Sequence, residues 1–362
     1  MPGRGTSGAV LCLRGPPVAW TWAGYCGAMR VVVLGATGNL GSSVVERLVA
    51  DEAVKSVVGI ARRRPRWRPE KVEWVEADVV DSELSPHFTG ADAVVHLAWA
   101  FQPSHRTEDT WSVNAVGSSR VLDAVERAGV PVLVVASSVG AYSPGGKAVL
   151  VDESWPSHGW APAAYCREKA YVERLLDHFE TAVPGCRVVR MRPCFLFKHQ
   201  AAPEQRRIFA GPLAPEYLLG RFGIPVVPDL AGLRVQAMHT DDAAEAFVRA
   251  IHADVTGPFN LTAEPVVDAA VIADAFGGRS VKLPAAPLRL ALAVAWRMRL
   301  VPAPPDLFDY ALHMPLMDAS RAHRELDWRP QKTSLEALAE FRRGLRDGTG
   351  FPTPPLTSSR RR

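Results

Sequence analysis

The sequence contains no uncharged hydrophobic run long enough to span a membrane as a helix. Its most apolar stretch, residues 288–301, is interrupted by Arg289, Arg297 and Arg299, whereas a spanning helix needs roughly 18 or more consecutive apolar residues. We therefore interpret this stretch as a buried or amphipathic helix, and we expect no membrane partner.

Cysteine is scarce, and its spacing matches no known framework. The five cysteines are an odd number, with no CxxC motif and no cysteine and histidine spacing typical of zinc ligands. We expect neither a disulfide framework nor a metal site. A reducing cytoplasm is the predicted location.

Excess positive charge is confined to the two ends of the chain. Arg4 and Arg14 lie in an N-terminal stretch without acids, and Arg360, Arg361 and Arg362 end the chain. Without these five arginines the formal net charge changes from +4 to −1. A near-neutral body lacks the basic surface that binding to a phosphate backbone requires, so nucleic acid is not an expected partner.

The two ends also differ in composition from the rest of the chain. Residues 1–28 are rich in glycine and proline, and Arg14, Pro16 and Pro17 split their apolar runs. We interpret them as a disordered N-terminal extension, with a signal peptide as the alternative. Residues 352–362 are expected to form a disordered tail.

Between these ends, short apolar runs alternate with helix-length amphipathic stretches. The chain is 48% hydrophobic and 22% charged, which is typical of a globular protein. Repeated strand, helix, strand order is typical of a doubly wound parallel sheet. The predicted strands are 30–34, 56–60, 72–75, 93–97, 132–136 and 187–191, and the predicted helices are 40–50, 114–128 and 164–179.

This alternation predicts an α/β protein with two parts. A Rossmann-type doubly wound parallel sheet is expected over 29–195, and 235–254 is expected to return to it. The alternation weakens after Pro193, where proline and glycine become frequent. Residues 196–234 and 255–345 are therefore expected to form a smaller C-terminal substrate domain.

A glycine-rich turn follows the first predicted strand. Gly35, Gly38 and Gly41 recur at a spacing of three where the strand gives way to a helix. Residues without a Cβ let the backbone approach a pyrophosphate, which the helix N-terminal N–H groups can hold. A tight turn without a ligand is the alternative, but the position at the first strand-to-helix junction favours a dinucleotide.

No acidic residue ends the second predicted strand, where a carboxylate would bind both ribose hydroxyls of NAD. The residues there are Ala61, Arg62, Arg63 and Arg64. Guanidinium groups pair with phosphate in bidentate fashion, so Arg62 and Arg63 favour NADP(H), with NAD(H) as the alternative cofactor. A solvated basic loop is the other interpretation of these arginines.

Three residues form a candidate proton-transfer group. Tyr165 and Lys169 lie four apart in a predicted helix and therefore share one face. A phenol has a pKa near 10, so proton exchange near neutrality requires a nearby cation such as Lys169. Ser138 follows the fifth predicted strand, and open α/β sheets bind ligands at the carboxyl ends of their strands. A strand-end serine is otherwise a common turn residue.

The glycine turn, strand-end serine and tyrosine-lysine helix, in this order, resemble the extended short-chain dehydrogenase/reductases. That group includes the NAD-dependent epimerase/dehydratase family of nucleotide-sugar enzymes. The resemblance covers about residues 30–346. Further matching motifs are Ala-Asp-Val at 77–79, His-Leu-Ala at 96–98, Asn114, Arg192-Pro193, His-Thr-Asp-Asp at 239–242 and Leu-Asp-Trp-Arg-Pro at 326–330.

The resemblance implies roles for individual residues. Tyr165 would be the catalytic acid/base, Ser138 would orient the reacting oxygen, and Lys169 would bind the nicotinamide ribose and lower the pKa of the tyrosine. Asp78 would contact the adenine. Asn114 would lie beneath the active site, where satisfying a backbone group is an equally good interpretation. The expected cofactor-binding residues are Gly35, Thr37, Gly38, Asn39, Leu40, Gly41, Arg62, Arg63, Asp78, Leu97, Ala98, Asn114, Tyr165, Lys169 and Pro193.

The chain departs from the nucleotide-sugar enzymes after Pro193. Those enzymes usually place an asparagine and then a glycine there, whereas this chain continues Cys-Phe-Leu-Phe-Lys over 194–198. The segment Trp-Ala-Phe at 99–101 adds aromatic side chains that belong either to a pocket or to the core. Both segments favour an apolar substrate over a UDP-sugar.

We therefore predict an NAD(P)-dependent oxidoreductase that transfers a hydride to or from a carbonyl or hydroxyl carbon of a small molecule. A nucleotide-sugar epimerase or dehydratase similar to UDP-glucose 4-epimerase is the first alternative. A non-catalytic dinucleotide-binding regulator is the second. The family commonly forms homodimers through the helices of Asn114 and Tyr165, and the resemblance implies the same assembly here.

Overall fold

The computed structural model describes residues 28–102, 104–209, 211 and 223–358. Apart from Ala28, the expected N-terminal extension lies outside these residues. Among them, the strands of the central sheet are β1 (Met29–Leu34), β2 (Val54–Ala61), β3 (Val72–Glu76), β4 (Ala93–His96), β5 (Val132–Ala136), β7 (Arg187–Pro193) and β11 (Gly257–Leu261).

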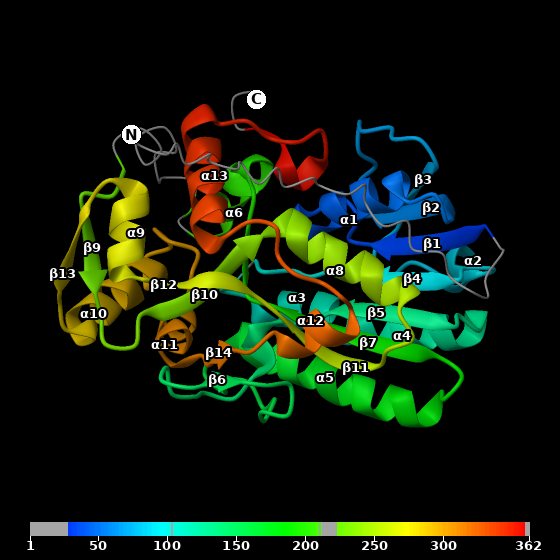
Figure 1. Ribbon diagram of the computed structural model, residues 1–362, viewed down its shortest axis with the longest axis horizontal. Helices are drawn as coiled ribbons and strands as arrows, with labels where there is room; N and C mark the ends of the chain where they lie inside the picture. The colour runs from blue at the N-terminus through cyan, green and yellow to red at the C-terminus, as the bar shows by residue number, and fades with distance from the viewer. Residues whose placement is uncertain (1–27, 103, 210, 212–222, 359–362) are drawn as a thin grey trace, which may run out of the picture.

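These seven strands are all parallel, in the order β11-β7-β5-β4-β1-β2-β3 (Figure 1). The order reverses between β1 and β4, which is where open α/β sheets bind their ligands. The arrangement confirms the predicted Rossmann-type doubly wound sheet.

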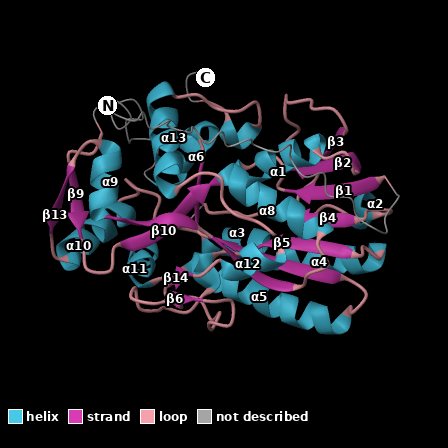
Figure 2. Cartoon of the chain, viewed as in Figure 1, coloured by secondary structure: helices cyan, strands magenta, loops and turns pink. Residues whose placement is uncertain are grey.

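Helices cover both faces of this sheet (Figure 2). One face carries α1 (Asn39–Ala50) and α8 (Thr240–His252). The other carries α2 (Ser85–Phe88), α4 (Gly117–Ala128) and α5 (Ala164–Ala182). The strands are therefore buried on both sides, which explains why they are continuous apolar runs in the sequence.

Strand β1 contributes side chains to the hydrophobic cores on both faces of the sheet. Successive side chains of a strand point to opposite faces. Val31 and Val33 pack with the residues of α1 and α8, whereas Val32 and Leu34 pack with those of α2, α4 and α5. All four side chains are fully buried.

Shorter elements surround the carboxyl edge of the central sheet. A three-stranded sheet contains β8 (Phe195–Phe197), β10 (Arg234–His239) and β12 (Ala263–Asp268), in the order β12-β10-β8. Two two-stranded sheets pair β9 (Val226–Asp229) with β13 (Arg279–Lys282) and β6 (Leu150–Val151) with β14 (Leu316–Met317). The remaining helices include α3 (Thr107–Trp111), α6 (Ala202–Phe209), α9 (Ala269–Phe276), α10 (Ala285–Arg297), α11 (Pro305–His313), α12 (Ser320–Glu325) and α13 (Ser334–Asp347).

The boundary between the two parts differs from the expected one at two strands. Residues 257–261 were assigned to the substrate domain, but they form β11, which pairs with β7 and buries Phe259 and Leu261 completely. Residues 235–239 were expected to return to the central sheet, but they lie in β10, which pairs with β8 and β12. Strand pairing over long sequence distances, which periodicity does not reveal, accounts for both differences.

Helix α10 occupies most of the apolar stretch singled out in the sequence. It has no buried residue, and Leu290 is 66% exposed. Among the described residues, no helix is both long and apolar enough to cross a membrane.

The C-terminal segment is more ordered than expected. Leu356 and Thr353 are buried, and η4 (Pro354–Leu356) is a turn of 3-10 helix. The Trp67 backbone N–H donates to the carbonyl of Pro352 at 3.2 Å, and the Trp67 ring contacts Phe351 with centroids 4.9 Å apart. The expectation of disorder is therefore wrong for residues 352–358, because Leu356 and Thr353 are buried and the Pro352 carbonyl is hydrogen-bonded to Trp67. Residues 359–362 lie outside the described part of the chain.

Candidate active site

The turn between β1 and α1 requires glycine at two of its three positions. Gly35 has a φ of +75°, in the left-handed region, and a Cβ there would lie 2.7 Å from the backbone nitrogen of Ala98. A Cβ on Gly41 would collide with the carbonyl oxygen of Gly35. These glycines let the turn pack against itself and against the segment that follows β4.

Gly38 differs from the other two glycines, because a Cβ there would make only an ordinary van der Waals contact. It is the N-cap of α1, and no side chain caps the helix. The first N–H groups of α1 are therefore available to an anion, and a helix N-terminus favours negative charge. This cradle fits the pyrophosphate of a dinucleotide.

The neighbouring residues of the predicted cofactor site hold this turn in place. Asn39 donates to the carbonyl of Leu196 at 3.3 Å and accepts from the Thr240 hydroxyl at 3.1 Å, which links α1 to β8 and α8. Thr37 is buried, and Leu40 packs against the core. The Leu97 N–H donates to the carbonyl of Leu34 at 3.0 Å. Thr37, Leu40, Leu97 and Ala98 are thus parts of the cradle or of the strand end beside it.

The residues expected at the adenosine end lie after β2 and β3. Arg62 and Arg63 are exposed, and no contact with another described residue holds either side chain, which leaves both guanidinium groups available. Arg64, in contrast, donates to the carbonyl of Trp74 at 2.8 Å. The Asp78 carboxylate accepts from the Val80 N–H at 3.0 Å and shapes the turn after β3.

The structure brings Ser138, Tyr165 and Lys169 together at the carboxyl edge of the sheet. The Tyr165 hydroxyl donates to the Ser138 Oγ at 2.9 Å, and that oxygen also accepts from the Gly140 N–H at 3.0 Å. A Cβ on Gly140 would collide with the Tyr165 ring. Lys169 lies one helical turn further along α5. The chain thus places two hydroxyl groups and an amine around one point.

The Lys169 amine contacts a backbone carbonyl and an aromatic ring. Its Nζ donates to the carbonyl of Ala136 at 2.8 Å and lies 3.4 Å from the centre of the Trp99 ring. Burial lowers the pKa of Lys169 to about 7. Burial also raises the pKa of Tyr165, and the hydrogen bond to Ser138 opposes this only partly. The role that the resemblance implies for Lys169, lowering the pKa of the tyrosine, stays a prediction.

Aromatic side chains surround Tyr165. The Phe101 ring stacks on it with centroids 5.1 Å apart and an interplanar angle of 15°, and Trp99 meets it edge-on at 5.9 Å. Phe101 is 38% exposed. Phe101 therefore belongs to a pocket wall and not to the core.

Asn114 fixes the backbone of this wall. It lies in the π-helical turn η1 (Ser112–Val116) before α4. Its amide accepts from the Ala100 N–H at 2.7 Å and donates to the Ala100 carbonyl at 2.8 Å. A second donation, at 2.6 Å, goes to Glu168 on α5. Asn114 thus satisfies backbone groups and positions Glu168, and it does not face the glycine turn.

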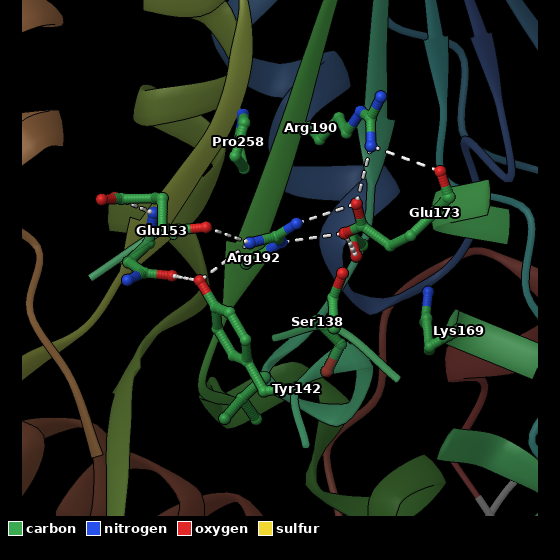
Figure 3. A network of polar contacts seen from close by, with 12 residues as sticks. Ser138, Tyr142, Glu153, Lys169, Glu173, Arg190, Arg192 and Pro258 are labelled. Atoms are coloured by element: carbon green, nitrogen blue, oxygen red, sulfur yellow. Dashed lines mark hydrogen bonds and ion pairs between the residues drawn. The ribbon is translucent and has the colours of Figure 1, made fainter. Parts of the chain in front are cut away.

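A buried ionic network lies beside Ser138 and Lys169 (Figure 3). Glu173, one turn beyond Lys169, accepts from Arg192 Nε at 2.8 Å and Nη2 at 2.9 Å, from Arg190 at 3.0 Å and from the Ser137 hydroxyl at 2.6 Å. Burial opposes its ionisation, but the hydrogen bonds and charge of Arg192 outweigh burial and lower its pKa to about 2. The network joins the ends of β5 and β7 to α5.

The same arginine reaches the neighbouring strand. Arg192 Nη1 donates to the Tyr142 hydroxyl at 2.9 Å, and that hydroxyl donates to the Asn260 side chain on β11 at 2.6 Å. Pro193 follows Arg192 and pairs in register with Leu261. Pro193 therefore lies inside the sheet, at the end of β7.

Glu168 and Glu173 were not identified from the sequence. Glu173 lies four residues after Lys169 and eight after Tyr165, so it shares their helix face. A carboxylate on a face that packs against a sheet is a detectable signal of a buried ion pair. Glu168 gives no comparable signal, because its partners Thr110 and Asn114 come from a distant helix.

Comparison with known families identifies relatives over most of the chain. The profile of the NAD dependent epimerase/dehydratase family matches residues 31–261. An uncharacterized protein of Mycobacterium tuberculosis is 28% identical over 326 residues, which cover 89% of this chain and 31% of that protein. The chain thus spans about a third of the length of that relative.

Two further relatives have named activities. A UDP-glucose 4-epimerase of Mycolicibacterium smegmatis is 27% identical over 329 residues, covering 86% of this chain and 97% of that enzyme. A 3-diazoavenalumate denitrifying reductase of a Streptomyces species is 30% identical over 256 residues, covering 67% of this chain and 78% of the reductase.

Among solved structures, the UDP-glucose 4-epimerase of Thermus thermophilus in complex with NAD has a TM-score of 0.66 and 23% identity. The match covers 88% of this chain and 99% of the epimerase. This likeness shows a common fold.

Proposed function

Because the chain belongs to the NAD-dependent epimerase/dehydratase family, we propose that it is a net oxidoreductase, which transfers a hydride between NADP(H) and a carbonyl or hydroxyl carbon of a small molecule. The observation that carries this proposal is the 2.9 Å hydrogen bond between Tyr165 and Ser138, at the sheet edge beside an aromatic wall. Its relatives are epimerases and reductases, so the chain is an enzyme, which sets aside the non-catalytic regulator.

The glycine cradle and the exposed arginines supply the groups that would hold the dinucleotide. The uncapped N-terminus of α1 behind Gly38 would take the pyrophosphate, and Arg62 and Arg63 would take a 2′-phosphate. The bound dinucleotide supplies a hydride to a carbonyl carbon or accepts one from an alcohol.

Proton transfer falls to the residues of the chain. The Tyr165 phenol has an ordinary pKa near 10 and burial raises it further, so the hydroxyl carries its proton at neutral pH and can donate it to a substrate oxygen. In reduction, the carbonyl carbon gains the hydride while its oxygen gains the Tyr165 proton, which yields an alcohol and leaves the dinucleotide oxidised. Ser138 orients the substrate oxygen by hydrogen bonding.

Removing the Tyr165 hydroxyl tests this role. We expect Tyr165→Phe to lower NADPH-dependent turnover of a panel of ketones and aldehydes by about 10² to 10⁴-fold, the usual contribution of a general acid. NADPH binding, measured by isothermal titration calorimetry, should stay unchanged. Tyr171→Phe is the matched control, because Tyr171 lies on the same helix with its side chain outside the site. Undiminished turnover by Tyr165→Phe would refute the role.

We further propose a preference for NADP(H) over NAD(H). The support is the pair of exposed arginines after β2, where the chain offers no carboxylate to the ribose hydroxyls. Calorimetric titration should show tighter binding of NADPH than of NADH. The double variant Arg62→Ala and Arg63→Ala should lower the ratio of the NADH to the NADPH dissociation constant by about 10- to 100-fold. Arg127 is an exposed arginine at the end of α4, and Arg127→Ala should leave this ratio unchanged. Tighter binding of NADH by the unaltered enzyme would overturn this preference.

We also propose a homodimer formed through the helices that carry Asn114 and Tyr165. Trp111, Val116 and Tyr171 are 39%, 45% and 41% exposed, and the Trp111 and Tyr171 rings contact each other at 4.7 Å. These side chains supply an apolar face. Val121 of α4, in contrast, is fully buried against the sheet and does not belong to this face.

A nucleotide-sugar epimerase remains the second candidate. The observation in its favour is the similarity to the epimerase of M. smegmatis, which extends over 97% of that enzyme. Such an enzyme returns the hydride to the same substrate, so it retains its dinucleotide. This difference separates the two candidates.

A further inference from the structure

We propose that the substrate is a neutral ketone or aldehyde carrying one aromatic ring, and that the ring binds in the cavity beside Tyr165. This inference rests on the hydride-transfer function proposed above. It is argued from the size, the wall, the charge and the rigidity of that cavity.

The cavity has the size of a single ring. Its volume is about 130 Å³, and residues from the segment after β4, from α5, from the end of α6 and from the α10 to α11 region line it. An apolar cavity of about 150 Å³ holds benzene, whereas drug-sized ligands occupy roughly 300–1,000 Å³. The described walls beside Tyr165 thus fit a ring with a short carbonyl substituent.

The wall is aromatic on several sides. Phe101 stacks on Tyr165, and the Phe209 ring meets Phe101 at 6.1 Å with an interplanar angle of 66°. Trp296 of α10 and Leu307 of α11 complete the apolar lining. Stacked and edge-on ring contacts each contribute about 0.5–1.5 kcal/mol beyond simple burial, so these walls favour a flat aromatic group.

The charges around the cavity disfavour an anion. Glu168 and Asp306 line it, and Glu168 is buried between the Thr110 hydroxyl and the Asn114 amide, each at 2.6 Å. Arg167 is the one cation among the described lining residues. Its guanidinium donates to the carbonyls of Ala161 at 2.5 Å and Pro162 at 3.0 Å. Two carboxylates and one engaged guanidinium disfavour an anionic substrate such as a diphosphate or a carboxylate.

The walls are tied to one another before any ligand binds. The Trp296 indole N–H donates to the Ser104 hydroxyl at 3.1 Å, and that hydroxyl donates to the carbonyl of Pro302 at 2.5 Å. Gln102 donates to the carbonyl of Ile208 at 3.0 Å. These bonds connect the segment after β4 to α6 and to the end of α10. A preformed cavity spends little binding energy on reorganisation.

Binding of three probes to the full chain, without dinucleotide, tests the inference. The probes are acetophenone, phenylglyoxylate as an anionic aryl ketone, and UDP-glucose, each followed by saturation-transfer NMR and competition. We expect acetophenone to bind, phenylglyoxylate to bind at least about tenfold more weakly, and UDP-glucose not to displace acetophenone. Equal binding of phenylglyoxylate, or displacement of acetophenone by UDP-glucose, would overturn the inference.

Two wall variants and one control locate the bound ring. Phe101→Ala and Phe209→Ala should each weaken acetophenone binding by about two- to tenfold, the loss of one aromatic contact. Phe101 and Phe209 are both 38% exposed, so both variants are expected to fold. Trp155→Ala removes an aromatic of similar exposure, 36%, that does not line the cavity, and should leave binding unchanged. Equal affinity in all three variants would place the probe elsewhere and refute the inference.

The outcome also separates this inference from the proposed function. Acetophenone bound in the cavity but never reduced with NADPH would support the ligand class and count against the reductase. NADPH-dependent turnover confined to anionic or nucleotide-linked carbonyls would support hydride transfer and refute the ligand class.

Discussion

Lys169 is a buried amine whose charge state changes near neutral pH. Burial lowers its pKa from an ordinary value of about 10.5 to about 7. One backbone carbonyl and the face of the Trp99 ring stabilise its charge. Among the described residues, no carboxylate contacts the amine directly. The charged form of this residue therefore costs folding free energy, a cost consistent with a functional role for the amine.

The sign of the resulting pH dependence follows from proton counting. Below pH 7 both the folded and the unfolded chain hold the Lys169 proton, and the full destabilisation is present. Between about pH 7 and 10.5 the unfolded chain binds more protons than the folded chain, so the free energy of unfolding rises with pH. The destabilisation is gone above that window.

Denaturant unfolding of the enzyme and of Lys169→Met, at pH values from 6.5 to 10, measures this effect. The free energy of unfolding of the unaltered enzyme should rise relative to that of Lys169→Met, by at most about 1.4 kcal/mol per pH unit. A difference between the two proteins that stays constant or moves the other way across this range would show that the amine keeps its proton.

Sequence reasoning singled out the candidate proton-transfer residues because their spacing carries information. Tyr165 and Lys169 lie within one helix, and Ser138 ends a strand, so local periodicity brings out all three. The partners that set their pKa values were not predictable in the same way. Trp99 beneath Lys169 belongs to a segment 70 residues away, and its position depends on the folded sheet.

Helix α5 separates its roles by face. Tyr165, Lys169 and Glu173 recur every four residues along the side that meets the ends of β5 and β7. Tyr171 points away from these three and contacts Trp111 of α3. The helix thus presents the candidate proton-transfer residues inward and an apolar ring outward.

The outward face is expected to bury itself against a second copy of the chain. In multi-angle light scattering, the enzyme should have twice the 39.3 kDa mass of one chain. Tyr171→Glu places a charge in that apolar contact and should give the mass of one chain, while Tyr171→Phe should stay dimeric. A single-chain mass for the unaltered enzyme at every concentration would contradict the dimer.

The elements of the first half of the chain were predictable, and those of the second half were not. Each early strand is a buried apolar run next to an amphipathic helix, so composition alone indicates it. Strands β8, β10 and β12 are short and pair across large sequence distances. Their pairing depends on tertiary contacts, and so does the recruitment of β11 to the central sheet.

At the scale of the whole molecule, the strand order places the reacting groups at one sheet edge. The glycine turn after β1, the segment after β4 and Ser138 after β5 all lie at the carboxyl ends of neighbouring strands. Segments from the second half of the chain close over this edge and complete the aromatic cavity. The first half thus carries the proposed proton-transfer residues and Phe101 of the cavity wall, and the second half adds Phe209, Trp296 and Leu307 to that wall.

The proposed enzyme catalyses net hydride transfer, so its dinucleotide exchanges with solution between turnovers. An epimerase instead returns the hydride to the same substrate and retains its dinucleotide. The most direct measurement is to purify the enzyme, denature it, identify any released nucleotide by mass spectrometry, and record thermal shifts with a panel of UDP-sugars. We predict no stoichiometric retained NAD and no shift with a UDP-hexose, because exposed arginines suit an exchanging cofactor and the cavity suits a neutral ring. Tightly retained NAD together with a shift by a UDP-hexose would contradict the reductase and establish the epimerase.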